Sequence, residues 1–503
     1  MTTSALDAVA HAPRAAATAF RVPLFLRGEL IEEDWVEFGT PGSGRSFLAP
    51  DPHRWAERLP LATPMDLADL HAVPFEEILD VLDAVGKALD FAKNPHVRRA
   101  YEAGLVATNY PASMLAQSYV TLPFVFAREY VREMAERTVG IASLDGWVEH
   151  RLLDGRELRV RAFGARTLHI PAGNGGLVSA VTLIRNAITR SDAIVKVPSN
   201  DPLTAIALAR TFADVAPNHP LTKHLAVAYW KGGDVVVEEQ ICRPEKIEKI
   251  VAWGGFASVK HVTRYIQPGL ELIALDPKRS ASIIGPEAFA SEATLRDVAR
   301  RAATDVGVAN QEGCACARVI WVLSGTDAEG LARINRLGEL IYEELLALPE
   351  TVSTRPKTFD PELRDHMLAT RLGGADWFRV IGGERQEGGV IVSQIDEPVD
   401  YAPMLSGRVA NLVPVDDIER VTRAVNTYTQ TVGIYPESLK RSLRDLLPLF
   451  GAQRLTSLGY ACHVATAMPQ DAIEPVRRMC KWIVEETCEP AVVAPMWGAR
   501  TES

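Results

Sequence analysis

The sequence lacks features that are typical of metal-binding, disulfide-stabilised and membrane-spanning proteins. It has six cysteines in 503 residues, and no two of them have the C-x-x-C spacing of zinc or redox motifs. A set this sparse is typical of a reduced, cytoplasmic protein rather than of a disulfide-stabilised secreted one. Runs of about 18 consecutive apolar residues are missing too, so the sequence predicts no membrane span.

Positive charge is in deficit. Lysine and arginine number 54 against 64 aspartates and glutamates, which gives a formal net charge of -10. Nucleic acids and anionic lipids both require a basic surface, so neither is predicted as a partner. Hydrophobic residues make up 47% of the chain, which at this length predicts two or three packed domains.

The first half of the chain changes character several times. Residues 1–20 are rich in alanine and threonine but lack the apolar core of a secretory signal, so a disordered leader is expected. From Pro74 to Ala142 apolar residues recur at three- and four-residue spacing, which predicts helices. Residues Trp147–Phe163 predict a β-hairpin around the turn Asp154-Gly155.

Strands and helices then alternate, which predicts an α/β fold with parallel sheets covered by helices. The expected strands are Arg166–Ile170, Ala193–Val197, His224–Tyr229 and Ile250–Trp253, with a helix at Ala205–Val215. A second unit is expected to begin near Asp276, with strands Ala281–Ile284 and Arg318–Leu323 and a helix that a capping box at Thr294 and Asp297 opens and that ends near Val306. Ligands of such sheets bind beyond the carboxyl ends of the strands.

The turn before the strand at Arg318 carries the strongest chemical signal. It reads Asn-Gln-Glu-Gly-Cys-Ala-Cys-Ala over residues 310–317, so small residues surround the thiol of Cys314. An acyl group can approach such a thiol, and one backbone amide aimed at a developing oxyanion is worth about 3–4 kcal/mol. Two alternatives remain: Cys316 is the nucleophile, or both thiols are buried residues of a core strand. Cys242, Cys462, Cys480 and Cys488 are expected to be structural.

The cysteine turn is the last of four segments that occur in the order and spacing of the aldehyde dehydrogenase superfamily. The other three are His169–Asn174, Ile194–Ser199 with Pro202-Leu203, and Trp253–Ser258. The chain resembles one branch of this superfamily, the acyl-CoA and acyl-protein reductases of the LuxC type, in further segments. These are Val22–Leu24, Arg27–Glu29, Gly173-Asn174, Ala252–Gly255 and Pro469–Asp471 to Lys481-Trp482. The resemblance extends from about residue 21 to residue 485.

This resemblance implies an aldehyde-dehydrogenase-like fold of two Rossmann-like parallel-sheet domains and a small β oligomerisation arm. Residues 21–146 and 164–275 would form the cofactor-binding domain, and residues 276–451 the catalytic domain. Residues 147–163 and 452–503 would form the arm and the carboxyl-terminal segment. A homodimer or homotetramer follows by analogy.

The resemblance also assigns roles to residues. Cys314 would be the nucleophile, and the Asn174 amide would complete the oxyanion hole. Lys196 would hold the adenosine ribose of the cofactor, and Pro171, Ser199, Gly254 and Gly255 would lie around it. Relatives selective for NAD often have a glutamate at the position of Ser199. A serine there spares a 2′-phosphate the repulsion of a carboxylate, so NADPH is expected.

One departure from the superfamily pattern bears on the reaction. Its aldehyde-oxidising members keep a glutamate where this chain has Ala274, and the nearby Glu271 has the wrong spacing to replace it. Without that base, water would attack an acyl-enzyme slowly. The expected reaction is therefore reduction of an acyl thioester to an aldehyde, with an acyl-activating ligase as a possible partner. The alternatives are an aldehyde-oxidising NAD(P)-dependent dehydrogenase and a non-catalytic binding protein of the same fold.

Overall fold

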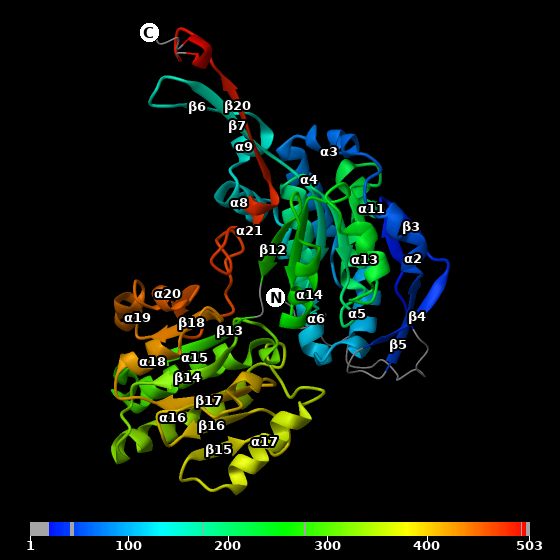
Figure 1. The fold of residues 1–503 in the computed structure, drawn as a ribbon. Helices are drawn as coiled ribbons and strands as arrows, with labels where there is room; N and C mark the ends of the chain where they lie inside the picture. The colour runs from blue at the N-terminus through cyan, green and yellow to red at the C-terminus, as the bar shows by residue number, and fades with distance from the viewer. Residues whose placement is uncertain (1–19, 41–44, 174, 276–277, 494, 499–503) are drawn as a thin grey trace.

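The computed structural model describes residues 20–40, 45–173, 175–275, 278–493 and 495–498. Figure 1 shows two bodies, each built on a β-sheet, and a narrow arm that projects away from them. Apart from Phe20, the expected leader lies outside the described residues. Among the residues described, none of the helices is both long enough and apolar enough to cross a membrane.

The first body is built on a seven-stranded sheet with the order β12-β11-β8-β9-β10-β2-β3. Its pairs are parallel from β12 to β10, and β2 and β3 add two antiparallel strands at one edge. The strands are β2 (Leu24–Leu26), β3 (Glu29–Ile31), β8 (Arg166–Ile170), β9 (Asp192–Lys196), β10 (Leu225–Ala228), β11 (Lys249–Trp253) and β12 (Glu271–Leu275). The four strands expected here are all present, with ends shifted by at most one residue.

Helices surround this sheet, as the alternating pattern predicts (Figure 1). They are α2 (Pro52–Trp55), α3 (Ala68–His71), α4 (Phe75–Ala88), α5 (Pro95–Ala107), α6 (Ala112–Val120), α7 (Leu122–Val125), α8 (Arg128–Thr138), α9 (Ile141–Asp145), α10 (Gly176–Ile188), α11 (Thr204–Val215), α12 (Pro220–Lys223), α13 (Val235–Ile241) and α14 (Phe256–Val262).

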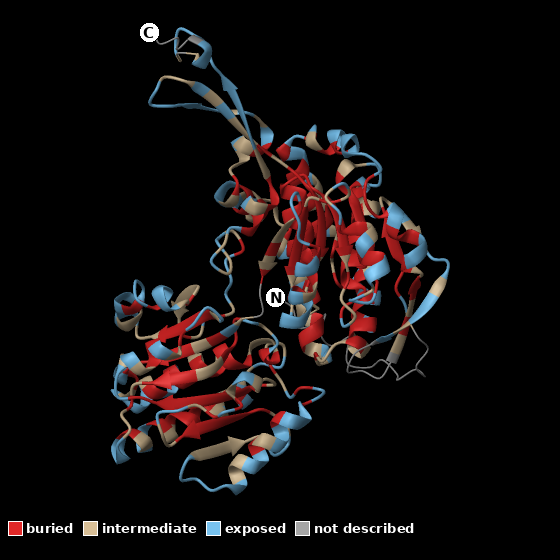
Figure 2. Ribbon diagram, in the orientation of Figure 1, coloured by how far each residue is buried: buried red, intermediate tan, exposed pale blue. Residues whose placement is uncertain are grey.

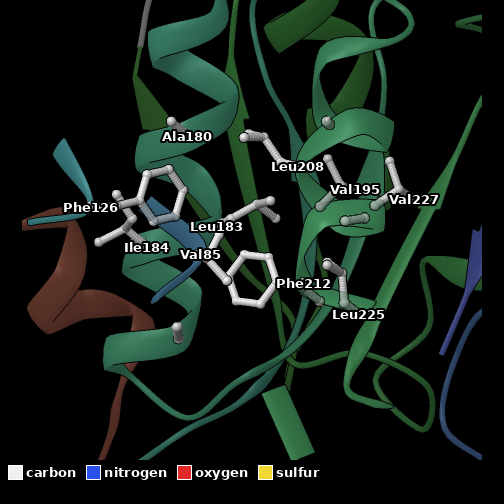
Figure 3. Close-up of a cluster of buried hydrophobic side chains, with 14 of the residues drawn as sticks. Val85, Phe126, Ala180, Leu183, Ile184, Val195, Leu208, Phe212, Leu225 and Val227 are labelled. Atoms are coloured by element: carbon white, nitrogen blue, oxygen red, sulfur yellow. The ribbon is translucent and has the colours of Figure 1, made fainter. Parts of the chain in front are cut away.

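The largest core cluster lies between these helices and the sheet (Figure 3). Val195 and Val227 of the strands pack there with Leu183 of α10. The rings of Phe126 and Phe212 meet edge to face with centroids 6.4 Å apart. A fully buried side chain of this size contributes about 1.5–3 kcal/mol to folding, so this packing fixes α10 against the sheet.

The second body is also a seven-stranded sheet, with the order β15-β16-β17-β14-β13-β18-β19. All its pairs are parallel except β15 with β16. The strands are β13 (Arg279–Ile284), β14 (Ala317–Val322), β15 (Phe378–Gly382), β16 (Gly389–Ser393), β17 (Val409–Pro414), β18 (Thr429–Tyr435) and β19 (Arg454–Ser457). Its helices are α15 (Glu292–Gly307), α16 (Ala328–Ala347), α17 (Pro361–Leu372), α18 (Ile418–Ala424), α19 (Glu437–Leu443) and α20 (Leu447–Phe450).

Two details of this body differ from the sequence-based expectation. The capping residue of α15 is Ser291, whose hydroxyl accepts a hydrogen bond from the Thr294 amide, so the predicted box at Thr294 and Asp297 is wrong. A serine and a threonine three residues apart both satisfy the capping pattern, and the strand-like backbone of Ser291 decides between them. The sheet also extends past residue 451, because β19 pairs with β18.

Two small sheets complete the fold. The first has the order β1-β5-β4 and consists of β1 (Phe20–Arg21), β4 (Trp35–Thr40) and β5 (Arg45–Pro50). The projecting arm is the hairpin of β6 (Val148–Arg151) and β7 (Glu157–Phe163), to which β20 (Lys481–Thr487) adds an antiparallel strand. In Figure 2 the central strands of both large sheets are buried, whereas the arm is exposed along most of its length. The short helix α21 (Pro475–Met479) precedes β20.

Candidate active site

The expected cofactor residues meet at one edge of the first sheet. Strands β8, β9 and β11 are parallel neighbours, and they end at Ile170, Lys196 and Trp253. Their carboxyl ends therefore bring together Pro171, Lys196 and Ser199, and the pair Gly254-Gly255. This is the edge at which parallel sheets bind ligands.

Lys196 is a desolvated cation at this edge. Its Nζ lies 6.0 Å from the centroid of the Tyr229 ring and 5.7 Å from that of Trp230. Burial lowers the pKa of its ammonium to about 8, against a smaller raising effect of Glu238. Within the described part of the chain, no carboxylate forms an ion pair with it. A cation held this way fits an anionic group of a cofactor, such as a phosphate.

Two glycines of this edge differ in their surroundings. A Cβ on Gly173 would lie 1.8 Å from Asn200 Oδ1, because the Asn200 amide donates a hydrogen bond to the Gly173 carbonyl at 2.8 Å. A Cβ on Gly255 would meet nothing within 4 Å. Gly173 therefore lets two loops of the protein approach each other, whereas Gly255 leaves open space at the start of α14.

Sequence reasoning missed one carboxylate near this edge. Glu238 of α13 is buried and accepts hydrogen bonds from His261 at 2.6 Å and from the Tyr265 hydroxyl at 2.8 Å. Burial raises the pKa of Glu238, but the hydrogen bonds from His261 and Tyr265 outweigh it, so the pKa is lowered and the carboxylate stays ionised. A glutamate inside an apolar helix segment has no motif around it, and only the fold brings it near Lys196.

The cysteine turn is held by a buried amide. Residues Ala309, Asn310 and Gln311 have left-handed φ angles of 53°, 51° and 67°. Gln311 is buried, and its side-chain Nε2 donates to the carbonyls of Ala317 at 2.8 Å and Val409 at 2.9 Å. Its Oε1 accepts from the Val409 amide at 3.0 Å. This side chain fastens the turn to β14 and β17 and offsets the cost of the unusual backbone.

The two cysteines of the turn lie in different environments. Cys314 is solvent-exposed, whereas Cys316 is fully buried. The Cys316 thiol donates to the Val308 carbonyl at 3.2 Å, and its sulfur lies 3.6 Å from that of Cys462. The idea that both thiols are buried core residues is therefore wrong for Cys314, and the expected turn between helix and strand is confirmed.

Cys314 is accessible, yet the surrounding protein partly dehydrates it. This desolvation raises the pKa of its thiol. The side-chain amide of Gln430 lowers the pKa, and the charge of Asp471 raises it. The thiolate that a nucleophile needs is therefore scarce at neutral pH unless donors stabilise it.

Contacts between the two bodies place the cysteine turn beside the cofactor edge. Tyr110, buried at the end of the α5–α6 loop, feels the charges of Glu312 and Cys316, which add to the rise of its pKa caused by burial. Its ring would lie 3.8 Å from a Cβ on Gly175. Gly175, which precedes α10, therefore lies near the cysteine turn. Asn174 itself lies outside the described residues, so its predicted role stays a prediction.

Ala274, which the resemblance places at the superfamily's base position, lies within β12 and has no proton-accepting side chain. Glu271 begins the same strand, at its other end. Its two carboxylate oxygens accept from Lys249 at 2.7 Å and from Arg478 at 2.7 Å. These ion pairs commit Glu271 to holding α21 and β11 against β12.

Solved structures share this architecture. An NADP-dependent glyceraldehyde-3-phosphate dehydrogenase from Bacillus halodurans superposes with a TM-score of 0.70 at 13% identity, over 93% of this chain and 99% of that one. Aldehyde dehydrogenase 21 from Physcomitrella patens gives a TM-score of 0.72 at 12% identity, over 94% of this chain and 99% of that one. At such low identity these similarities establish the aldehyde-dehydrogenase-like fold.

The proteins that are similar in sequence belong to a narrower group than those that share the fold. A long-chain acyl-protein thioester reductase of Photorhabdus luminescens is 30% identical over 338 residues, which are 66% of this chain and 66% of the relative. One from Vibrio harveyi is 26% identical over 346 residues, or 67% and 68% of the two chains. The matched part thus spans about two thirds of these relatives. The family model of acyl-CoA reductases (LuxC) matches residues 70–482, most of the chain. The chain therefore belongs to the acyl-CoA reductase (LuxC) family.

Proposed function

We propose that this protein reduces a long-chain acyl thioester to an aldehyde through an acyl group held on Cys314, with NADPH as the cofactor. The observation that carries the proposal is the contrast within the cysteine turn. Cys314 is exposed, close to the cofactor edge of the first sheet, while Cys316 is fully buried and hydrogen-bonded. A thiol that must accept a bulky acyl group needs the first environment and cannot work in the second.

In the proposed reaction the Cys314 thiolate attacks the carbonyl carbon of the thioester, and the carrier thiol leaves with a proton. The acyl group stays on Cys314 as a new thioester. Bound NADPH would supply a hydride to that carbonyl. The resulting thiohemiacetal then collapses, which releases the aldehyde and returns the electron pair to the Cys314 sulfur. Backbone amides of the turn and the Asn174 side chain would stabilise the oxyanion in both steps.

The choice of reduction over oxidation rests on Ala274 and Glu271. Ala274 cannot take a proton from water, and both oxygens of Glu271 are engaged with Lys249 and Arg478. An acyl-Cys314 intermediate would therefore persist until hydride or a thiol reaches it. An aldehyde-oxidising enzyme needs the opposite, rapid attack by water.

The choice of NADPH rests on Lys196 and Ser199. The Lys196 ammonium lacks an ion-pair partner in the described residues, and Ser199 follows the same strand. The 2′-phosphate of NADPH would supply the missing charge. The open space at Gly255 would admit the cofactor's pyrophosphate.

Three further features belong to this proposal. The exposed arm of β6, β7 and β20 would pair subunits in a homodimer or homotetramer. An acyl-activating ligase would supply the thioester, because the acid itself lacks a leaving group. The protein would act in the cytoplasm, where its six free cysteines stay reduced.

A steady-state assay tests the proposal. Purified protein is mixed with NADPH or NADH and a panel of acyl-CoA esters of 8 to 18 carbons (about the range of natural fatty acids), and the nicotinamide absorbance and the aldehyde are followed. We expect NADPH oxidation matched by aldehyde formation, lost in Cys314→Ala. Aldehyde formation that persists in Cys314→Ala, or free acid as the product, would contradict it.

A further inference from the structure

Gln430 occupies a place beside the cysteine turn that the resemblance does not explain. It lies in β18, which neighbours β13 in the second sheet, and its side chain is buried. Burial raises the pKa of the Cys314 thiol, and the side-chain amide of Gln430 lowers it.

The backbone fixes Cys314 and β18 to each other through one serine. Ser280 of β13 is buried, and its hydroxyl donates to the Cys314 carbonyl at 2.7 Å. The same oxygen accepts from the Thr431 amide at 3.1 Å. Thr431 is the next residue after Gln430, so this bridge sets the distance between Gln430 and the nucleophile. Neither group can move without breaking a buried hydrogen bond.

A carboxylate orients the Gln430 amide. Gln430 Nε2 donates to Asp471 Oδ1 at 2.6 Å. Asp471 lies in a tight loop that two backbone hydrogen bonds between Gln470 and Ile473 close, at 2.9 and 3.0 Å. Arg185 of α10, which is also buried, donates to the Gln470 side chain at 3.0 Å and so ties this loop to the first body. The carboxylate therefore fixes the nitrogen, not the oxygen, of the Gln430 amide on the Asp471 side.

From this arrangement we propose that Gln430 is a further catalytic residue, whose side-chain amide donates a hydrogen bond to the Cys314 sulfur, with Asp471 and Ser280 as its positioning residues. The inference rests on the proposed function, in which Cys314 is the nucleophile. An amide nitrogen has two N–H groups, so one binds Asp471 while the other serves the sulfur. No proton is transferred: the bond stabilises the thiolate.

The bond acts at both ends of the proposed reaction. It stabilises the thiolate that attacks the thioester, and it stabilises the same thiolate when the thiohemiacetal collapses and Cys314 leaves. The hydrogen bond is weaker in the acyl-enzyme, because a thioester sulfur carries little negative charge. Gln430 thus partly offsets the dehydration and the Asp471 charge, which both raise the pKa of the thiol.

The test is the pH profile of Cys314 alkylation in the full-length protein. Iodoacetamide modification of the Cys314 peptide is followed by mass spectrometry from pH 6 to pH 10.5 (a range of roughly two units on either side of an ordinary cysteine pKa). The variants are Gln430→Met, which keeps the length but has no donor, and Gln430→Asn, which keeps the amide but shortens its reach. Gln453→Met is the matched control, since the Gln453 amide donates to the Thr427 carbonyl at 3.5 Å.

We expect the apparent pKa of Cys314 to rise by about one unit in Gln430→Met, and by less in Gln430→Asn. The alkylation rate at pH 7 should then fall about threefold, because the smaller thiolate fraction is partly offset by its greater nucleophilicity. Gln453→Met should keep the wild-type profile. If Gln430→Met does not fold, the Gln430→Asn profile decides.

An unchanged profile in a folded Gln430 variant would overturn the inference, even if turnover falls. This readout needs no acyl substrate. A wild-type protein that fails to reduce acyl thioesters while the pKa shift is present would refute the proposed function and leave the hydrogen bond standing. Turnover with no pKa shift would refute the role of Gln430 alone.

Discussion

The sulfur of Cys316 lies 3.6 Å from the sulfur of Cys462, which belongs to the segment after β19. This contact joins the cysteine turn to a part of the chain 146 residues later. Together with the hydrogen bond to the Val308 carbonyl, it occupies the second thiol of the turn. Two cysteines separated by one residue therefore have different tasks: one faces solvent, and the other anchors the turn.

Replacing the anchoring thiol should leave the chemistry in place. In Cys316→Ala the buried sulfur is lost, and we expect a destabilisation of about 1–3 kcal/mol with turnover within about threefold of the wild type. Cys314→Ala should show the reverse, normal stability and no turnover. Thermal denaturation and acyl-CoA-dependent NADPH oxidation, measured on both variants, separate the two roles. Loss of turnover in a folded Cys316→Ala protein would reassign the nucleophile.

Cofactor affinity should depend on the protonation of Lys196. Burial lowers the pKa of this lysine to about 8 in the free protein, so its positive charge is present below that pH and lost above it. Binding of NADP⁺ should therefore weaken between pH 7 and pH 9, while NAD⁺, which lacks the 2′-phosphate, should respond less. Lys196→Met should lose about tenfold or more in NADP⁺ affinity along with this pH dependence, and Lys196→Arg should keep the charge at every pH. Calorimetric titration measures all three proteins, and identical NADP⁺ affinities at pH 7 and pH 9 in the wild type would count against the assignment.

The open space at Gly255 gives a prediction that separates binding from folding. In Gly255→Ala the new methyl group meets no protein atom within 4 Å, so the melting temperature should stay within about 2 °C of the wild type. The methyl group would intrude on the cofactor and weaken NADP⁺ binding severalfold. Gly39→Ala, in β4, has equally free surroundings and serves as the control, with both properties unchanged. Normal NADP⁺ binding by Gly255→Ala would place the cofactor elsewhere.

The arm should control assembly. Ile483 and Val484 in β20 are 43% and 51% exposed, which is costly for neighbouring apolar residues unless another subunit covers them. The double variant Ile483→Asp and Val484→Asp should reduce the mass found by light scattering to about 55 kDa, the mass of one chain. A wild-type protein that is itself monomeric would contradict the role of the arm in pairing subunits.

Regular periodicity made much of the fold predictable from the sequence. Four of the five parallel strands of the first sheet were predicted, and their ends fall within one residue of the prediction. The fifth, β12, was not predicted. Strand β19 was not predictable in this way, because Arg454–Ser457 is short and only partly buried. It belongs to the second sheet through its pairing with β18. The start of α15 likewise depends on which of two hydroxyl residues adopts the extended backbone.

The site was predictable where residues carry a motif. Lys196 ends β9, Gly254 follows β11 and Cys314 precedes β14, each in a segment that resembles a superfamily motif. The parallel strands bring Lys196 and Gly254 to one edge of the first sheet. Glu238, Ser280 and Gln430 carry no local signal, because each acts through a contact with a segment distant in sequence. Their side chains are ordinary for a helix or a strand, and only the register of β13 and β18 places Gln430 beside the thiol.

The most direct measurement for the central claim is the mass of the protein after incubation with a long-chain acyl-CoA in the absence of NADPH. The account predicts a persistent adduct of one acyl group, located on the Cys314 peptide and released as aldehyde when NADPH is added. Acylation of Cys316, or of neither cysteine in a folded protein that still forms aldehyde, would contradict it.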